Sequence, residues 1–393
     1  MAFRRQLVHE AVVWNGRRAL SLSNGAVGLT LLLDGGHFVD FRRMNDGPAG
    51  INVIWEAPYR TMDPAAFTSE LESAYGPNGV GRFLSGYTGH ALALDYFGPA
   101  PQSNPDLPLH GEIASAPWDI LKVDEALKSL TACFTAEAPV RKLRLQRDIH
   151  LVTSEHVAYV RESVSNLTDE TRPLHWVEHA AFGEPMLDPE QSVVALPGSK
   201  MQTWPLAYDH GRALLADNFE SEWPLSKTRD EEVIDISQPF PRAQTGFVVA
   251  VKLDEARDLG YVAVLNWRLG LAAGYLFRRA DFPWVAIWEE NQARDGAPWS
   301  GRTRVRGLEF GSTPMPLGLN HPLVSAPLFG TPTFMTLAPG ETRSAAYAMF
   351  IAQVPTHWRS ITDIATCNGA IVIRFGKESV HLAATALQEF GLL

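Results

Sequence analysis

The sequence predicts an all-β protein, built as a large antiparallel β-sandwich with only a few short helices. The first observation is a series of turn dipeptides along the chain, in which asparagine and glycine tolerate the positive φ of tight hairpin turns. They include Asn15-Gly16, Asn24-Gly25, Asp34-Gly35 and Asn368-Gly369. The second observation is that apolar or alternating runs lie between such turns, as expected of antiparallel strands with a buried face.

Strand-like segments recur from one end of the chain to the other. The clearest cover residues 26–33, 142–152, 156–167, 175–182, 245–253, 261–269, 284–290 and 344–354. Helical windows are few, and the best two are PAAFTSELESAY over residues 64–75 and SVHLAATALQEF over residues 379–390. The glycine-rich stretch GPNGVG has the wrong spacing for a dinucleotide-binding fingerprint, and no phosphate-binding loop motif occurs.

The 393 residues are enough for one large β domain or two ordinary ones. No long linker, low-complexity tract, clear internal repeat or shift in composition marks a boundary. We therefore expect a single domain over residues 1–393.

Composition narrows the class of partner. Hydrophobic residues make up 46% of the chain and charged residues 20%, which is typical of a compact soluble protein. The formal net charge is −10 with no basic run, so nucleic acid is a poor candidate partner. No stretch approaches the roughly 20 apolar residues of a membrane span, and the N-terminus has no apolar signal segment. We expect a cytoplasmic protein whose oligomeric state the sequence leaves open.

The two cysteines, Cys133 and Cys367, form neither a CxxC pair nor a metal-ligand spacing. We therefore expect free thiols and no structural metal, because a chain of this length can bury a stable core without disulfides or a metal site.

The segment RPLHWVEHAAFGEP contains two histidines. On a strand, His175 and His179 share one face, but four strand residues span about 13 Å, whereas one zinc ion needs both nitrogens near about 2 Å. A structural role is the better interpretation for His175. His179 lies just before a glycine-proline turn, at a strand end, and is a candidate site residue.

A second candidate is Glu309, in the alternating segment RVRGLEFG. A carboxylate among small and apolar neighbours usually forms a structural ion pair. If it faces a cleft, burial raises its pKa and makes it a usable base near neutral pH.

The third candidate is His110, which follows two prolines and precedes a glycine in PDLPLHGEI. Proline and glycine place it in a shaped loop or at a strand end, where proteins often hold functional side chains. An isolated loop histidine is more often merely solvated. The chain also has 11 tryptophans, most of them expected in the core, of which a few in a cleft would suit stacking on sugar rings.

These segments together resemble the galactose mutarotase-like, or aldose 1-epimerase, superfamily. PLHGEI is similar to its Leu-His-Gly segment, EHAAFGEP to the strand that ends in a catalytic histidine, and LEFGSTPMP to the strand with the catalytic glutamate. The resemblance implies a supersandwich fold, Glu309 as the base, His179 as the acid and His110 as a hydrogen-bonding partner of the sugar.

The chain departs from the superfamily pattern at the substrate contacts. Many members have Gly-Arg-x-x-Asn-Arg, whereas VGRFLSGY keeps Gly81 and Arg82 and has Ser85-Gly86 in place of Asn-Arg. The substrate-binding aspartate has no convincing counterpart. We expect Arg82, or one of Arg302, Arg304 and Arg306, to bind the substrate instead, with Arg82 and Arg306 as the first candidates.

The resemblance implies an isomerase that interconverts the anomers of a free sugar or sugar derivative by acid/base ring opening, without a cofactor or metal. Two alternatives remain open: a non-catalytic sugar-binding β-sandwich, and an isomerase or lyase that acts on a modified or phosphorylated sugar. All three take a small-molecule carbohydrate as the partner.

Overall fold

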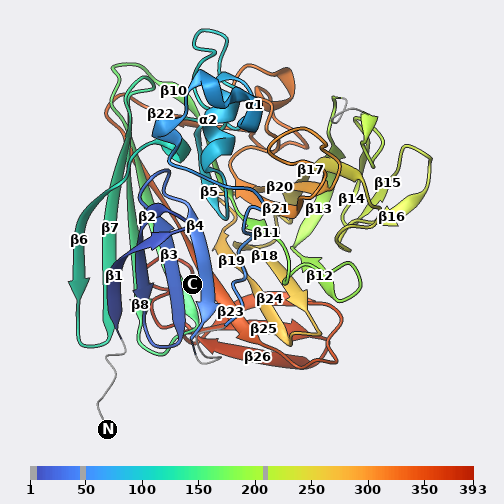
Figure 1. Cartoon of the computed structure of the whole chain (residues 1–393). Helices are drawn as coiled ribbons and strands as arrows, with labels where there is room; N and C mark the ends of the chain where they lie inside the picture. The colour runs from blue at the N-terminus through green and yellow to red at the C-terminus, as the bar shows by residue number, and fades with distance from the viewer. Residues whose placement is uncertain (1–6, 45–49, 207–210) are drawn as a thin grey trace.

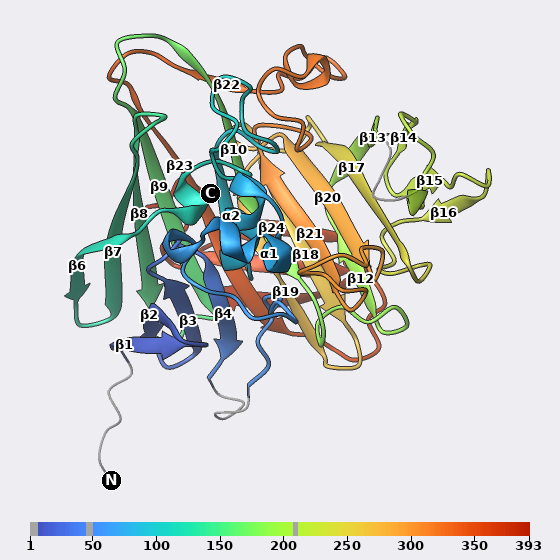
Figure 2. The same ribbon diagram turned by 45° about the horizontal axis from the view of Figure 1, so that its top comes forward.

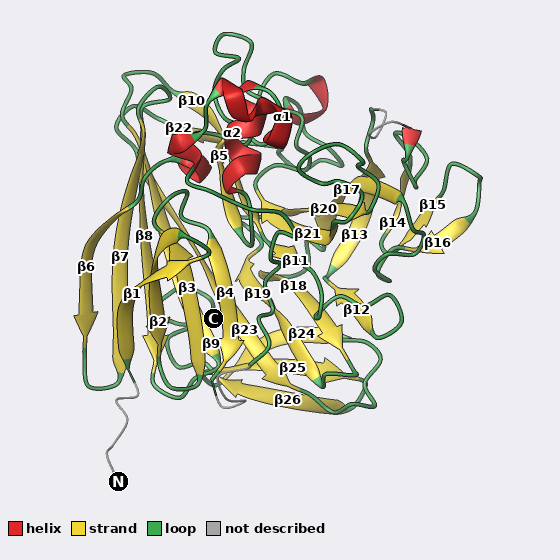
Figure 3. Cartoon of the chain, in the orientation of Figure 1, coloured by secondary structure: helices red, strands yellow, loops and turns green. Residues whose placement is uncertain are grey.

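The computed structural model describes residues 7–44, 50–206 and 211–393. Strands dominate the structure, and the helices are short and gathered at one end (Figures 1 and 3). All pairings between the named strands are antiparallel in the described ranges, which confirms the predicted fold class.

Two large sheets form the body of the molecule (Figure 2). One has eight strands in the order β12 (Ser192–Ala195), β18 (Leu259–Asn266), β19 (Leu271–Arg278), β23 (Thr342–Gln353), β9 (Val157–Asn166), β8 (Leu143–Val152), β7 (Ser129–Ala138) and β6 (Asp119–Glu125). The other contains nine strands, seven of them in the order β14 (Glu220–Glu222), β13 (Gly198–Thr203), β17 (Thr245–Leu253), β20 (Trp284–Asn291), β21 (Arg304–Gly311), β10 (Arg172–His179) and β22 (Met335–Leu337). Its remaining strands are β5 (Ala91–Asp95), paired with β10, and β11 (Ala181–Phe182), paired with β21.

The main core lies between these two sheets. Leu308 and Phe310 of β21 share one hydrophobic cluster with Tyr275 of β19 and Tyr347 of β23. Because side chains alternate along a strand, Glu309 of β21 lies on the opposite face of its sheet. The nine-stranded sheet therefore has one face in the core and one face available for a site.

Smaller sheets cover other parts of the body. A four-stranded sheet contains β1 (Val8–Trp14), β2 (Arg17–Ser23), β3 (Val27–Leu32) and β4 (Phe38–Arg43). A three-stranded sheet, at the bottom of Figure 1, contains β24 (Asp363–Cys367), β25 (Ala370–Phe375) and β26 (Glu378–Ala383) and packs on the outer face of the eight-stranded sheet. The last pair is β15 (Leu225–Lys227) and β16 (Val233–Asp235).

The predicted helix over residues 379–390 is wrong. Residues 378–383 form β26 instead, and turns follow. Val380, Leu382 and Ala384 recur with a period of two, and they pack in the cluster between this sheet and the eight-stranded one. Pairing with β25 and this burial outweigh the helix propensity of the alanines and leucines.

The predicted helix over residues 64–75 is confirmed only in part. It is divided into two 3₁₀ turns, Pro64–Ala66 and Ser69–Leu71, and the short α1 (Glu72–Tyr75), which ends at Gly76 with φ 100°. The helix α2 (Asn78–Gly86) begins at an Asn-Gly pair that reads as a turn in the sequence.

The two cysteines are free thiols, with Cys133 buried and Cys367 exposed. Across the described ranges, no helix is long and apolar enough to cross a membrane.

Candidate active site

A cleft of about 430 Å³ opens on the face of the nine-stranded sheet that lies away from the core. The end of α2, the loop after β5 and the loop after β20 surround it. Its lining consists of Val80, Phe83, Leu84, Tyr87, Gly98, Leu109, His110, His179, Trp204, Val248, Trp288, Arg294, Trp299, Glu309 and Pro316. His110, His179 and Glu309, which are far apart in sequence, thus converge on one cleft.

Sheet register brings His179 and Glu309 together. Glu178 of β10 pairs with Phe310 of β21, so the next position sets His179 opposite Glu309. Nε2 of His179 and Oε1 of Glu309 are 3.1 Å apart, and both side chains are buried. The geometry is within ion-pair distance but does not make a hydrogen bond, so Oε1 has no hydrogen-bond partner among the described residues. A hydroxyl group bound in the cleft could supply one.

Gly307 gives the Glu309 side chain its room. These residues are two apart on β21 and share a face. A Cβ at position 307 would lie only 2.2 Å from Oε1 of Glu309. Gly307 therefore lets the carboxyl group lie back along the strand, beside Trp288 of the neighbouring strand β20, which pairs with Gly307.

Burial sets the protonation of this pair. It raises the pKa of Glu309 well above that of an ordinary carboxyl group. It lowers the pKa of His179 to about 3, against a weaker opposing effect of a backbone hydrogen bond. Both directions favour the uncharged pair in this buried environment. The reactive form, carboxylate with imidazolium, differs from it only in the position of one proton.

The turn that holds His110 has a demanding backbone conformation. His110 has φ 64° and Gly111 has φ 92°, both in the left-handed region. A Cβ at Gly111 would lie 1.8 Å from the carbonyl oxygen of Leu94, so only glycine fits there. Residues other than glycine rarely adopt this conformation, and those that do are concentrated at functional sites.

Hydrogen bonds also fix the His110 ring. Its Nδ1 accepts the backbone N–H of Gly98 at 3.1 Å, so the proton of the neutral ring is on Nε2. Burial lowers the pKa of His110 well below its ordinary value, and a proton on His179 would lower it further. The two imidazole rings are 5.2 Å apart between centroids, in an edge-to-face arrangement. His110 therefore offers the cleft an N–H donor.

Tyr87 is a site residue that sequence reasoning missed. Its hydroxyl forms a 3.1 Å hydrogen bond with Nδ1 of His179, which leaves Nε2 directed at Glu309. Burial raises the pKa of Tyr87 well above its usual value, so the phenol keeps its proton. Tyr87 directly follows Ser85-Gly86, where the resemblance to the superfamily fails.

The arginine that lines the cleft is Arg294, not Arg82 or Arg306. Arg306 is fully buried, with Nε 3.0 Å from Glu289 and Nη1 2.7 Å from the carbonyl oxygen of Ile236. Alternation along β21 turns its side chain to one side of the sheet and Glu309 to the other. Arg82 is exposed on α2 and lines a separate hollow with Pro108. The expectation that either arginine reaches this cleft is therefore corrected.

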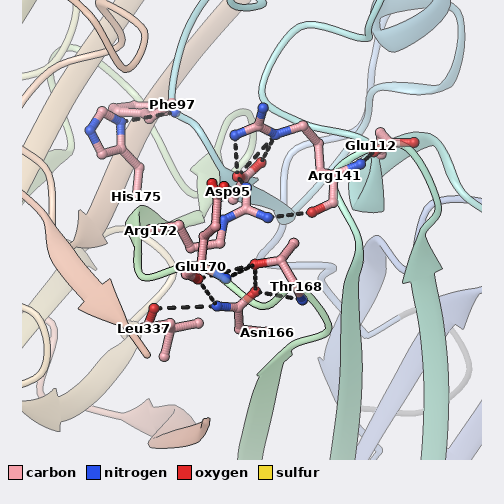
Figure 4. Close-up of polar contacts among 10 residues, drawn as sticks. All are labelled: Asp95, Phe97, Glu112, Arg141, Asn166, Thr168, Glu170, Arg172, His175 and Leu337. Atoms are coloured by element: carbon pink, nitrogen blue, oxygen red, sulfur yellow. Dashed lines mark hydrogen bonds and ion pairs between the residues drawn. The ribbon is translucent and has the colours of Figure 1, made fainter. Parts of the chain in front are cut away.

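A buried ion cluster braces the loop that carries His110 (Figure 4). Asp95, at the end of β5, accepts hydrogen bonds from the guanidinium groups of Arg141 and Arg172. The backbone N–H of Arg141 donates to Glu112 at 2.8 Å, and Glu112 is two residues beyond His110. The β7–β8 loop thus holds both the end of β5 and the His110 turn.

His175 has the structural role expected from the sequence. Its Nδ1 accepts the backbone N–H of Phe97 at 3.3 Å (Figure 4). Burial lowers its pKa to about 4, so the ring is neutral at physiological pH. This bond fixes the segment that leads to Gly98 and hence to the ring of His110.

The described residues contain no group of three or more His, Cys, Asp or Glu side chains that could hold a metal ion. The cleft itself holds a buried carboxyl group, two imidazole rings and a phenol. Such a set can take a proton from one oxygen of a ligand and give a proton to another.

Comparison with solved structures shows a galactose mutarotase-like fold. A protein from Klebsiella pneumoniae, provisionally assigned as an aldose 1-epimerase, is 16% identical with a TM-score of 0.60, over 89% of this chain and 84% of that one. A galactose mutarotase-like protein from Clostridium acetobutylicum is 14% identical with a TM-score of 0.57, over 89% and 100%. A provisionally assigned aldose 1-epimerase from Escherichia coli is 17% identical with a TM-score of 0.55, over 85% and 98%.

No curated protein matches the sequence. One family model does, over residues 14–315, and its description is a domain of unknown function, DUF4432. This region includes His110, His179 and Glu309 and covers well over half of the chain. The chain therefore belongs to the DUF4432 family.

Proposed function

We propose that this protein is an aldose 1-epimerase-like isomerase, which interconverts the two anomers of a sugar or sugar derivative. The observation that carries the proposal is the convergence of His110, His179 and Glu309 on one cleft. A buried carboxyl group beside an imidazole is a matched base and acid, for which a binding protein has no use. The fold shared with mutarotase-like structures supports the same reaction class.

In the proposed reaction, the carboxylate of Glu309 removes the proton from the C1 hydroxyl group. The imidazolium of His179 protonates the ring oxygen, and the C1–O5 bond breaks to give the open-chain aldehyde. Rotation about the C1–C2 bond exposes the other face of the aldehyde. Closure returns both protons and gives the other anomer, so the pair ends as it began.

The two groups lie close enough to act on neighbouring oxygens of one ring. Their 3.1 Å separation is short enough for proton exchange once the imidazole N–H turns into line with Oε1 of Glu309. His110 donates a hydrogen bond from Nε2 to the sugar and does not itself exchange a proton. Positioned acid/base groups of this kind contribute about 10²–10⁴-fold each to the rate.

The test is anomer interconversion followed by polarimetry or NMR, with Glu309→Gln as the key variant. We expect a loss of about 10²–10⁴-fold in rate with sugar affinity largely retained, because the amide keeps the shape and loses the base. His179→Gln should act likewise, and His110→Ala should mainly weaken binding. Affinity is measured by sugar-dependent protection against thermal unfolding.

Three outcomes separate the candidate functions. Acceleration that disappears in Glu309→Gln supports the epimerase. Sugar binding without acceleration by the unmodified protein supports a non-catalytic sugar-binding protein instead. A new product rather than a new anomer ratio, seen by NMR, supports an isomerase or lyase that acts on a modified sugar.

A further inference from the structure

The cleft is lined by one group of polar side chains and by a larger set of apolar and aromatic ones. At the floor lie the groups assigned to the reaction: Nε2 of His110, Nε2 of His179 and the carboxyl group of Glu309. The hydroxyl of Tyr87 is already bonded to His179, and Nδ1 of His110 is already bonded to Gly98. In the proposed reaction, the remaining polar atoms of this group therefore contact O1 and O5 of the sugar.

Apart from Arg294, apolar and aromatic side chains line two sides of the cleft around these groups. The first wall consists of Val80, Phe83, Leu84 and Leu109, from α2 and the loop before His110. The second consists of Trp204, Val248, Trp288 and Trp299, from β17, β20 and neighbouring loops. Val80 is 39% exposed, so it lies at the solvent-facing edge of this wall. The remaining carbons of the sugar must lie between these walls.

Arg294 is the charged side chain of the second wall. Its guanidinium carbon is 5.7 Å from the ring centroid of Trp288 and 5.2 Å from that of Trp299. Its Nε is 3.5 Å from Oε2 of Glu290, a fully buried carboxyl group. Because this carboxyl compensates the guanidinium charge, the wall favours a neutral sugar over a carboxylated or phosphorylated one.

We infer that the substrate is a neutral deoxy sugar, an aldose in which at least one hydroxyl group is replaced by hydrogen. This inference rests on the proposed function. A hydroxyl pressed against the aliphatic or phenyl groups of these walls loses its bonds to water and gains no partner there, whereas a methyl or methylene group at the same position packs well. Such a site prefers the deoxy sugar by the cost of the unpaired hydroxyl, roughly 5- to 150-fold.

The test compares anomerisation rates for matched sugars with the unmodified protein. Each deoxy sugar is paired with its parent: D-fucose with D-galactose, D-quinovose and 2-deoxy-D-glucose with D-glucose, and 2-deoxy-D-ribose with D-ribose. We expect kcat/KM for at least one deoxy sugar to exceed that of its parent by roughly 5- to 150-fold. D-galacturonate and D-galactose 6-phosphate serve as charged probes and should be the poorest substrates.

Val248→Thr tests whether the wall causes the preference. The change keeps the shape and adds a hydroxyl at the wall, so it should lower the ratio of deoxy to parent kcat/KM by roughly 5-fold. Val193→Thr, the same change on β12 outside this cleft, is the matched control and should leave the ratio unchanged.

The outcomes distinguish this inference from the proposed function. If parent sugars are turned over as fast as their deoxy partners, or a charged sugar is the best substrate, the deoxy inference is overturned and the epimerase stands. If no sugar in the panel is anomerised faster than in buffer, both are overturned. An unchanged ratio in Val248→Thr overturns the role of this wall.

Discussion

Tyr87 shows how a single hydroxyl group can orient the proposed acid. It bonds to Nδ1 of His179, and its ring packs edge-on to the imidazole at 5.1 Å between centroids. Without the hydroxyl, the imidazole has no bond on that side and its Nε2 is less well directed at Glu309. Tyr87 is thus a positioning residue, since it acts on the sugar only through His179.

We predict that Tyr87→Phe lowers kcat by roughly 3- to 10-fold, the value of one neutral hydrogen bond, with little change in KM. The phenyl ring keeps the packing, so the fold should be retained. Anomerisation kinetics provide the measurement. Tyr75→Phe is the matched control, because the Tyr75 hydroxyl bonds to the carbonyl oxygen of Arg60 and does not touch His179. Equal losses in both variants would argue against the positioning role.

The sequence identifies the candidate residues that lie in recognisable local contexts. His110 is marked by its prolines and glycine, His179 by its strand end, and Glu309 by its alternating strand. Tyr87 and Arg294 carry no such local signal, because they reach the cleft only through the packing of α2 and of the loop after β20. The nearest clue was the departure at Ser85-Gly86, which indicated that other side chains must replace the missing contacts.

At the scale of elements, the His110 turn is held by a hairpin loop from the other large sheet. Arg141 lies in the loop between β7 and β8, and it contacts the end of β5 through Asp95 and the His110 turn through Glu112. Asp95 is fully buried, so its charge needs the two guanidinium groups. The eight-stranded sheet therefore helps to position a residue over the nine-stranded one.

We predict that Arg141→Met raises KM for the sugar several-fold and lowers the free energy of unfolding by about 1–3 kcal/mol. The cost stays below that of an unpaired buried charge because Arg172 still contacts Asp95. Chemical denaturation and anomerisation kinetics measure the two effects. Arg144→Met is the control, since Arg144 pairs with Glu137 in solvent, where such pairs contribute roughly 0–1 kcal/mol. The substitution removes only the side-chain bonds to Asp95, because the backbone N–H of residue 141 still donates to Glu112. A variant that loses stability but keeps its KM would contradict bracing of the site through Asp95.

Strands and helices were predictable from the sequence where a single hydrophobic pattern runs through the whole segment. The runs at 245–253 and 284–290 became β17 and β20 because they are buried on both faces of a sheet. The last strand, β26, was misread because Val380 and Leu382 gain their partners from β25 and the eight-stranded sheet. Helix α2 was missed because Gly79 and Gly81 lower helix propensity. Both fit tightly, since a Cβ at either would lie within about 2 Å of a backbone oxygen.

At the scale of the whole molecule, the fold buries five histidines among the described residues in their neutral form. Burial lowers their pKa values to about 3 for His37, His90 and His179, to about 4 for His175, and well below the ordinary value for His110. The sequence could not show this, because each is buried by strands distant in the chain. In the unfolded chain, all five titrate near their ordinary pKa of about 6.5.

Buried glutamic acids have the opposite effect on stability. Burial raises the pKa of Glu162 to about 8 and also raises those of Glu178 and Glu309. Between about pH 4.5 and 6.5, the folded state holds protons on Glu162 and Glu309 that the unfolded state has released, and the raised pKa of Glu178 acts in the same direction. The protons that the folded state keeps on these glutamic acids offset part of the protons that the histidines bind on unfolding, so the stability depends less on pH. His90 with Glu178, and His179 with Glu309, are two such compensating pairs.

We predict that the free energy of unfolding falls gradually between pH 6.5 and 4.5, where the glutamic acids offset only part of the proton uptake by the five histidines, and then falls more steeply toward pH 3.5. Below about pH 4.5 the unfolded glutamic acids are also protonated, so the offset ends. The histidines still bind protons only when unfolded, and each then costs about 1.4 kcal/mol per pH unit. Urea denaturation across this range measures how steeply the free energy of unfolding depends on pH. His37→Gln should lower that slope by the contribution of one proton, about 1.4 kcal/mol per pH unit. A fall that begins at pH 6.5 with the full slope would show that the glutamic acids are ionised in the folded protein.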